Sequence, residues 1–293
     1  MNRNNATGFR LIPLRNGTLG VFSEEFGEAM HPTIGPAQEA EALYVRQLRL
    51  RERVPAAADE FVVWDVGLGG AANASAVLRA AADAGGNLRL VSFECSVEAP
   101  AFALAHAAEL GYLGGLETPL RELLEGRATH FHFGRANVSW ELVIADFPSW
   151  LAAVESPAGV PPPHAILFDP FSPARNPAMW SLEVFTRLFR RLDPARPCSL
   201  ATYSRSTMTR VAMLLAGFWV GAGAASGVKE ETTLAANSPA LLPNLLDARW
   251  LAKARRSHNA EPLAAGSQER RPLSAESWER LLAHPQFATA ATG

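Results

Sequence analysis

Short apolar runs alternate with helix-length amphipathic stretches along most of this 293-residue chain. Seven runs have the length and composition of buried strands: residues 61–66, 88–93, 140–145, 165–168, 199–203, 218–220 and 232–235. Helical patterns separate most of them, at residues 72–84, 98–110, 182–192 and 207–216. Strands joined through helices pair in parallel with right-handed crossovers. The pattern therefore predicts a doubly wound, Rossmann-like α/β fold with a mostly parallel, seven-stranded sheet.

The pattern weakens at both ends of the chain. Residues 1–55 combine a polar start, a loop with Gly and Pro, and one amphipathic helix at 37–53, so we expect an N-terminal extension. Residues 56–252 hold the predicted sheet. Residues 253–293 show no core pattern and one helical stretch at 275–283, which predicts a polar C-terminal tail.

One uncharged stretch, residues 211–228, reaches the minimum length of a membrane span. Gly217 interrupts it, and much of it is Ala and Gly, so we interpret it as a helix end, a turn and a short strand. The first residues are polar and lack the apolar core of a signal peptide. The sequence thus predicts a cytoplasmic protein without a membrane segment.

Composition, net charge and cysteine content exclude few classes of function. Hydrophobic residues make up 48% of the chain and charged residues 19%, and the net charge is −2, so a nucleic acid would have to bind through a local basic patch. The two cysteines, Cys95 and Cys198, form no CxxC pair and have no His at ligand spacing. We therefore expect neither a disulfide framework nor a bound metal.

A glycine-rich segment follows the first strand and precedes a helix: Asp65-Val66-Gly67-Leu68-Gly69-Gly70-Ala71-Ala72-Asn73. Such turns need small residues because a ligand approaches the backbone closely and the torsion angles exclude most side chains. A tight strand–helix turn without a ligand would show the same pattern. The residues expected to bind a cofactor here are Asp65, Gly67, Gly69, Gly70 and Asn73.

Two carboxylates close the next strands. Glu94 ends the second strand, where dinucleotide- and nucleoside-binding sheets place an acid that accepts hydrogen bonds from ribose hydroxyls. Asp146 follows residues 140–145, where a carboxylate can accept a hydrogen bond from an adenine amino group. Because both strands end at the same edge of the sheet, we predict that the two acids share one cofactor site. A plain surface carboxylate is the alternative interpretation of Glu94.

The most informative segment follows the strand at 165–168: Phe168-Asp169-Pro170-Phe171-Ser172-Pro173-Ala174-Arg175-Asn176-Pro177-Ala178-Met179-Trp180. Ligands of open α/β sheets bind at such strand ends. An acid before Pro and an aromatic residue resembles the Asp-Pro-Pro-Tyr motif of amino-group methyltransferases, in which the acid holds the amine. An Asp-Pro turn that caps the next helix is the alternative interpretation.

Together these segments resemble the methyltransferase domain of the bifunctional tRNA 5-methylaminomethyl-2-thiouridine biosynthesis protein, over about residues 27–236. That family has Gly-x-Gly-x-Gly-x-Asn in its glycine turn, matched by residues 67–73 with Ala71 in place of the third Gly. Its Ser-Phe-Glu is similar to residues 92–94. Its Leu-Asp-Gly-Phe-Ala-Pro-Ala-Lys-Asn-Pro-x-Met-Trp is similar to residues 168–180, with Pro170 in place of Gly.

The resemblance implies a methyltransferase that moves methyl from S-adenosylmethionine (SAM) to the 5-aminomethyl nitrogen of the wobble uridine in tRNA. It implies that Asp169 is the catalytic residue that orients the amine. The residues expected to contact the substrate are Phe171, Arg175, Trp180, Tyr203 and Lys229. Packing in the core is the alternative role for Trp180. The bifunctional members also carry a flavin-dependent oxidase domain, for which we expect a separate protein here.

Other functions stay open at this point. The same fold could methylate a small-molecule or protein amine, and Ala71 and Pro170 would also suit a SAM-binding module without catalysis. An NAD-dependent oxidoreductase shares the glycine turn and the strand-end acid, but the chain has no Tyr-x-x-x-Lys motif. It also has no Gly-x-Ser-x-Gly elbow, phosphate loop or His-Glu-x-x-His motif, so those hydrolase and metalloprotease classes are not predicted.

Overall fold

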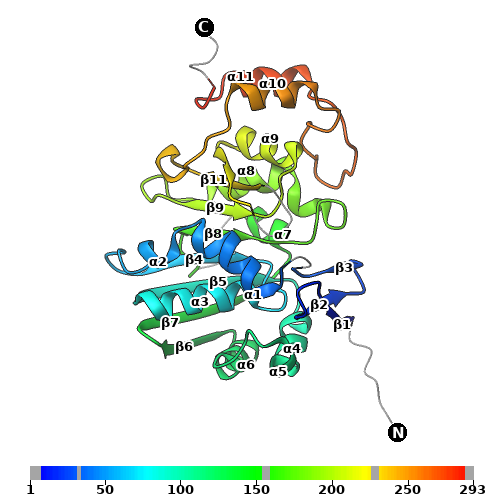
Figure 1. Ribbon diagram of the computed structural model, residues 1–293. Helices are drawn as coiled ribbons and strands as arrows, with labels where there is room; N and C mark the ends of the chain where they lie inside the picture. The colour runs from blue at the N-terminus through cyan, green and yellow to red at the C-terminus, as the bar shows by residue number, and fades with distance from the viewer. Residues whose placement is uncertain (1–7, 32–33, 154–158, 226–230, 288–293) are drawn as a thin grey trace.

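An eight-stranded sheet forms the centre of the computed structural model, which describes residues 8–31, 34–153, 159–225 and 231–287 (Figure 1). Its strand order is β10-β11-β9-β8-β4-β5-β7-β6. The strands are β4 (Phe61–Val66), β5 (Gly86–Glu94), β6 (Ala128–Phe133), β7 (Ala136–Ile144), β8 (Ala165–Phe168), β9 (Ser199–Thr202), β10 (Trp219–Gly223) and β11 (Thr232–Ala236). Strands β9, β8, β4, β5 and β7 are parallel to their neighbours in that series. The predicted doubly wound α/β class is confirmed.

The sheet has one strand more than the seven expected because the hairpin after residue 126 contributes both of its arms. Strand β6 pairs antiparallel with β7 and forms one edge of the sheet. At the other edge, β11 lies antiparallel between β9 and β10. The central strands read as continuous apolar runs because helices cover both of their faces. All six residues of β4 and all four of β8 are buried.

Helices cover the two faces of the sheet as separate layers, each with its own hydrophobic core (Figure 1). One layer holds α1 (Pro36–Ala40), η1 (Glu41–Arg46), α2 (Leu50–Arg53), α3 (Ala72–Ala84), α4 (Glu98–Ala105), α5 (Ala107–Leu110) and α6 (Glu117–Gly126). The other holds α7 (Phe147–Ala152), η2 (Pro177–Trp180), α8 (Leu182–Arg190), α9 (Thr207–Ala216), α10 (Ala248–Arg256) and α11 (Ala275–Leu282). A short 3-10 helix, η3 (Pro239–Leu241), follows β11.

The N-terminal segment differs from the expectation in two ways. A small antiparallel sheet of β1 (Phe9–Pro13), β2 (Leu19–Ser23) and β3 (Glu28–Ala29) precedes the first helix. The single helix expected at 37–53 is broken into α1, the π-helix η1 and α2. The break comes at Arg49, whose φ of 55° is left-handed. This conformation interrupts a helix because right-handed φ angles are needed for its hydrogen bonds.

The segment after residue 252 packs on the rest of the molecule. Helix α11 contacts α9, and Leu273, Leu281 and Phe287 are buried in the same core as the adjoining sheet face. The expectation that no core residues follow residue 252 is therefore wrong. The sequence pattern misses them because these apolar residues are widely spaced among polar ones.

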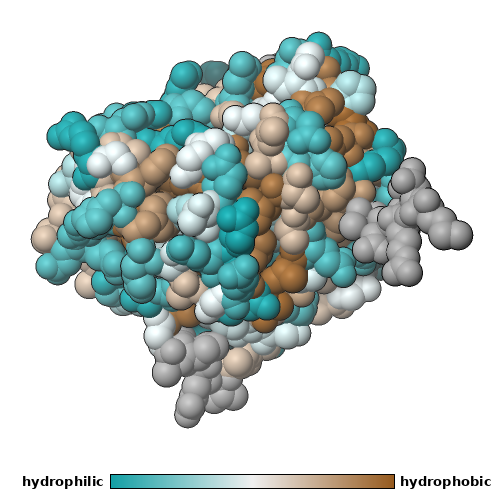
Figure 2. All heavy atoms as spheres, turned by 90° about the horizontal axis from the view of Figure 1, so that it is seen from below, coloured by the Kyte–Doolittle hydropathy of each residue, from teal (hydrophilic) through white to brown (hydrophobic). Residues whose placement is uncertain are grey.

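The uncharged stretch divides as predicted into the end of α9, a turn at Gly217 with φ of 108°, and β10. Within the described ranges, no helix has both the length and the apolar character that a membrane crossing requires. Figure 2 shows a face on which hydrophilic side chains surround smaller hydrophobic areas.

Candidate active site

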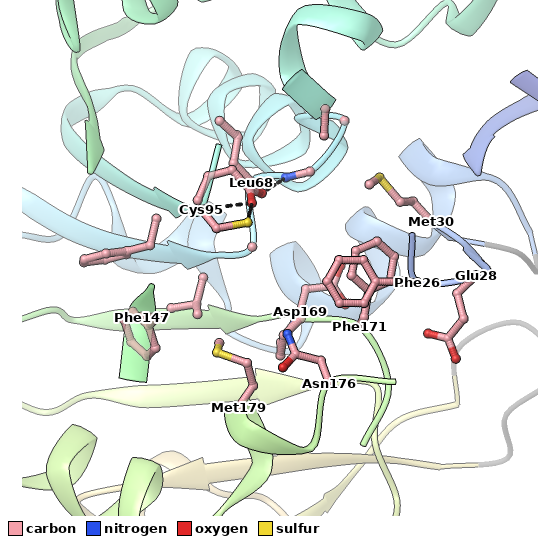
Figure 3. Close-up of a pocket in the computed structure, with 18 of the residues that line it drawn as sticks. Phe26, Glu28, Met30, Leu68, Cys95, Phe147, Asp169, Phe171, Asn176 and Met179 are labelled. Carbon is pink, nitrogen blue, oxygen red and sulfur yellow. Dashed lines mark hydrogen bonds between the residues drawn. The ribbon is translucent and has the colours of Figure 1, made fainter. Parts of the chain in front are cut away.

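A cavity of about 380 Å³ opens at the carboxyl ends of the central parallel strands (Figure 3). The strand registers pair Val66 with Phe93 and with Phe168, and Glu94 with Ile144, so four strand ends meet at this edge. We call the lining residues from these strand ends the pocket floor: residues 66–70, 93–96, 145–147 and 169–172. The N-terminal lining residues form the pocket roof: Phe9, Glu25, Phe26, Glu28, Ala29, Met30, His31 and Glu39.

The glycine turn lies under the cavity in a conformation that few other residues adopt. Gly67 and Gly69 have φ angles of 95° and 49°. A Cβ atom on Gly67 would lie 3.0 Å from the carbonyl oxygen of Asp169, so a side chain there would collide with the next strand's loop. Ala71 holds the left-handed conformation with φ of 61° at the N-terminus of α3. An alanine in place of glycine is therefore accommodated here, at a cost of about 1–2 kcal/mol.

Glu94 points toward the glycine turn. Its Oε2 accepts a hydrogen bond of 2.8 Å from the backbone N–H of Gly69. Its Oε1 accepts from the backbone N–H and the Sγ of Cys95, at 2.9 and 3.2 Å. Burial, followed by the neighbouring carboxylate, raises the pKa of the Cys95 thiol to about 12, which keeps it protonated. Glu94 is thus a carboxylate fixed by three donors at the cavity wall.

Asp146 lines the same cavity from the end of β7 and caps the next helix. It is the N-cap of α7, and its Oδ2 accepts hydrogen bonds from the backbone N–H and the hydroxyl of Ser149. This cap fixes the carboxylate at the cavity wall, next to Phe147. Both predicted strand-end acids therefore reach one pocket.

Asp169 lies where the floor meets the roof. Its backbone N–H donates to the carbonyl of Val66 at 3.0 Å, and its side chain is 14% exposed. Its Oδ2 accepts a 2.7 Å hydrogen bond from the side-chain amide of Asn73 and lies 3.8 Å from Nε2 of His31. The three carboxylates predicted from the sequence thus converge on one cavity with the glycine turn.

Two of the residues expected to bind a cofactor do not line the cavity. Asp65 is fully buried in β4, where its Oδ2 accepts a hydrogen bond from the hydroxyl of Ser92. Burial raises the pKa of Asp65 to about 8. Asn73 is 2% exposed and lies behind Asp169. Both side chains are therefore buried in hydrogen bonds to other residues, Ser92 and Asp169, and do not face the cavity.

The aromatic residues divide between pocket and core. Phe171 lines the cavity and stacks on Phe26 of the roof, with ring centroids 4.2 Å apart and planes at 15° (Figure 3). Tyr203 also lines the cavity, and its hydroxyl donates to the carbonyl of Pro170. Trp180 is fully buried and donates its indole N–H to the carbonyl of Phe171. The structure therefore assigns Trp180 to core packing that shapes the Asp169 loop.

The basic residues expected near the site do not form one patch. Arg175 is exposed and comes close to the roof, since a Cβ atom on Gly27 would lie 3.7 Å from its Nη2. Arg210 is 2% exposed and bonds to Thr233, Glu231 and the backbone of residue 232. These contacts fix Arg210 inside the protein, and it does not line the cavity. Lys229 lies outside the described residues.

The roof was not predicted from the sequence, yet it supplies 8 of the 29 residues that line the cavity. Glu28 attaches it to the floor, because its carboxylate accepts hydrogen bonds from the backbone N–H and the hydroxyl of Ser172. A signal for the roof does exist. Asn16-Gly17 stands between the apolar runs of β1 and β2, and Asn-Gly between such runs is a strong hairpin indicator.

Acidic residues dominate the polar part of the lining. The carboxylates are Glu25, Glu28, Glu39, Glu94, Glu98, Asp146 and Asp169. Among the described residues that line the cavity, none is Lys or Arg. This negative charge also affects two tyrosine hydroxyls. The pKa of Tyr44 and that of Tyr203 are raised well above the usual value, mainly by burial and then by the Asp169 carboxylate. A cavity of this kind favours cationic ligands.

The lining fits SAM by its own chemistry. SAM carries a sulfonium, an ammonium and a carboxylate group, so it is a net cation, which an acidic cavity favours, and its ribose hydroxyls donate to carboxylates. The glycine turn presents bare backbone, and a Cβ atom at Gly69 would lie 3.2 Å from the Met30 sulfur and narrow the space. Glu94 and Asp146 stand at successive strand ends beside that turn.

Within the described residues, no cluster of three or more potential metal ligands occurs.

Comparison with known proteins points to the same family of enzymes. Residues 117–238 match a family described as S-adenosyl-L-methionine-dependent methyltransferase. The chain is 30% identical over 218 residues to the tRNA 5-methylaminomethyl-2-thiouridine biosynthesis bifunctional protein MnmC of Caulobacter vibrioides, covering 71% of this chain and 35% of that protein. It is 27% identical over 291 residues to the protein of the same name from Chromobacterium violaceum, covering 92% and 42%.

The chain therefore spans less than half the length of these relatives. A solved structure with a similar fold is that of MnmC2 from Aquifex aeolicus, with a TM-score of 0.66 and 20% identity. The match covers 98% of this chain and 86% of the Aquifex chain. The resemblance noted from the sequence motifs is confirmed by these relatives.

Proposed function

We infer that this SAM-dependent methyltransferase, a relative of the methyltransferase part of the bifunctional MnmC proteins, transfers methyl to an amine nitrogen. The observation that carries the proposal is the acidic lining around Asp169, in which the described residues include seven carboxylates and neither Lys nor Arg. An amine is the common methyl acceptor that is cationic before and after the reaction. Carboxylates would stabilise it in both states.

The pocket floor is proposed to bind SAM. Gly67, Gly69 and Gly70 would let the cofactor approach the backbone, while Glu94 would accept from the ribose and Asp146 from the adenine amino group. Because Gly67 is in close contact with the backbone of Asp169, the floor brings the cofactor site and the acid together. SAM supplies a methyl group that is already electrophilic, so the protein needs no further activation of it.

Asp169 is proposed to orient the acceptor amine. Holding a nucleophile in line with the methyl group can contribute roughly 7–11 kcal/mol through proximity and orientation. The carboxylate would also stabilise the positive charge that grows on nitrogen during transfer. A carboxylate favours the protonated amine as well, so Asp169 suits positioning better than proton removal. His31, whose Nε2 lies 3.8 Å from Oδ2 of Asp169, is a nearby group that could take the proton.

We propose as substrate the 5-aminomethyl group of the wobble uridine in tRNA. The printed names of the relatives support this choice. The base would have to leave its stack and enter between floor and roof, where Phe171 and Tyr203 could pack on it. The phosphates would stay outside the acidic cavity, near Arg175 at the rim. A separate flavin-dependent oxidase would produce the amine.

A small-molecule or protein amine is the second candidate. The same acidic lining supports it, because a free alkylammonium ion needs no contact with phosphate to bind there. The exposed cations Arg249, Lys253 and Arg256 lie on α10, which packs in the layer away from the N-terminal roof (Figure 1). They do not extend the cavity.

The test is methyl transfer from isotopically labelled SAM to tRNA that carries 5-aminomethyluridine, read by nucleoside mass spectrometry. We expect label in one modified nucleoside and none with the Asp169→Ala variant. Label on free amines but not on tRNA would replace the tRNA proposal with the second candidate. SAM binding without transfer to any amine would leave a SAM-binding module.

A further inference from the structure

The side chain of Asn73 contacts the proposed catalytic acid instead of the cavity. Its Nδ2 donates to Oδ2 of Asp169 at 2.7 Å, at the short end of the normal range for a hydrogen bond to a carboxylate. Asn73 is 2% exposed, and the lining of the cavity does not include it. A buried amide behind a lining carboxylate can act on the reaction only through that carboxylate.

The bond also joins two parts of the chain. Asn73 is the second residue of α3, directly after the glycine turn, while Asp169 follows β8. The backbone of Asp169 is held as well, because its N–H donates to the carbonyl of Val66, on the other side of the same turn. Backbone and side chain of Asp169 are thus fastened to the two ends of the cofactor turn.

We propose that Asn73 is a positioning residue for methyl transfer, which fixes the Asp169 carboxylate relative to the glycine turn. This inference rests on the proposed function, because it takes Asp169 as the group that orients the amine. With the Asn73 bond in place, the carboxylate can rotate about its last side-chain bond only by giving up a charge-assisted hydrogen bond. Loss of the bond lets the carboxylate adopt orientations in which the amine is out of line with the methyl group.

The sequence motif alone places Asn73 with the cofactor, and the two roles predict different results. A cofactor-binding amide would lower SAM affinity when removed. A positioning amide would leave SAM affinity unchanged and lower the rate of the chemical step. Hydrogen bonds to charged groups have net strengths that correspond to about 10- to 100-fold in rate, and we expect kcat to fall by that factor.

The experiment compares Asn73→Ala and Asn73→Asp with a matched control, Ser75→Ala. Ser75 lies in the same helix and is equally buried, and its hydroxyl donates to the carbonyl of Ala71. Asn73→Asp keeps the shape of the side chain but sets a second carboxylate against Asp169, so we expect it to lower kcat more than Asn73→Ala does. If Asn73→Asp fails to fold, Asn73→Ala carries the test.

Each variant is measured by calorimetric titration with SAM, by kcat and KM for whichever amine the wild type methylates, and by its melting temperature. The proposal expects SAM affinity within about threefold of wild type for Asn73→Ala and a kcat lower by about 10- to 100-fold. It also expects no further loss when Asn73→Ala is added to Asp169→Ala, because the amide then has no acid to hold.

Two results would overturn the proposal. A loss of SAM affinity of tenfold or more in Asn73→Ala would return Asn73 to the cofactor site. An equal drop in kcat for Ser75→Ala would show a general effect of the helix. These results differ from failure of the proposed function. In that case the wild type itself would transfer no methyl group to an amine.

Discussion

The pocket floor and the pocket roof are two halves of one cavity, but they are built in different ways. The floor consists of strand ends and a glycine turn whose conformations follow from residues next to them in sequence. The roof depends on contacts between residues far apart, such as Glu28 with Ser172 and Phe26 with Phe171. We propose that this difference matches a division of function, in which the floor binds the cofactor and the roof selects the amine that enters.

The largest expected effect belongs to the floor. Asp169→Ala should lower kcat by about 10²–10³-fold, the range seen when one preorganised group is removed from a developing charge. SAM affinity should stay within a few fold, because Asp169 is proposed to face the amine. Steady-state kinetics with labelled SAM, together with calorimetry, measure both. Equal losses of rate and of SAM affinity would move Asp169 into the cofactor site.

Glu94→Ala tests the other function of the floor. It removes the carboxylate that is proposed to accept from the ribose and that also fixes Gly69. We expect SAM affinity to fall by about 10- to 100-fold, as for hydrogen bonds to a charged group. Unchanged affinity by calorimetry would rule out the ribose assignment. Glu122→Ala is a suitable control, since Glu122 contacts Thr129 on β6 and does not line the cavity.

Asp65, which is buried in β4, makes the stability of the fold depend on pH. Burial raises the pKa of Asp65 from 3.8 to about 8 in the folded protein. Between those values the folded state holds a proton that the unfolded state releases, so Asp65 stabilises the fold fully below about pH 4 and progressively less up to about pH 8. The slope is about 1.4 kcal/mol per pH unit, or tenfold in the folding equilibrium.

Asp65→Asn should remove this slope. Urea unfolding at pH 5, 6, 7 and 8 measures it, with wild type and variant compared at each pH. We expect the variant to gain stability relative to wild type as the pH rises through this window. Parallel curves for the two proteins would mean that Asp65 is ionised in the folded state.

The smallest effect is expected in the roof. Phe26→Ala removes the ring that stacks on Phe171, and aromatic pairs contribute about 0.5–1.5 kcal/mol beyond the area that they bury. We expect KM for the amine substrate to rise roughly 3- to 10-fold, with kcat changed less. Phe22→Ala is the matched control, because Phe22 lies in β2 under Arg10 and does not line the cavity. A fall in SAM affinity larger than the rise in KM would make the roof part of the cofactor site.

The pocket floor could be predicted from the sequence, and most of the pocket roof could not. Apolar runs and glycines in the sequence indicate the strand–turn–helix units of the floor. Strand β4 at residues 61–66 and helix α3 at 72–84 therefore lie at the predicted positions. The roof strands are five residues or fewer, and some of their packing partners lie far away in the sequence, such as Phe102 for Phe9 and Ser172 for Glu28. Local sequence patterns contain no information on such partners. They indicate only the hairpin of β1 and β2, through the Asn16-Gly17 turn.

Side-chain direction limited the site prediction in a similar way. Glu94, Asp146 and Asp169 could be placed because strand ends share one edge of the sheet. Whether Trp180 faces substrate or core depends on the path of the loop after Asp169, which the sequence does not specify. The same holds for Asn73, whose motif position indicates the cofactor while its amide bonds to the acid.

The central claim is that the glycine turn and the strand-end acids form one SAM site. Calorimetric titration of the wild-type chain with SAM, and separately with NAD, tests it most directly. We predict saturable binding of SAM at a single site and no binding of NAD. Binding of NAD without binding of SAM would contradict the claim and turn the same turn and acids into the site of an oxidoreductase.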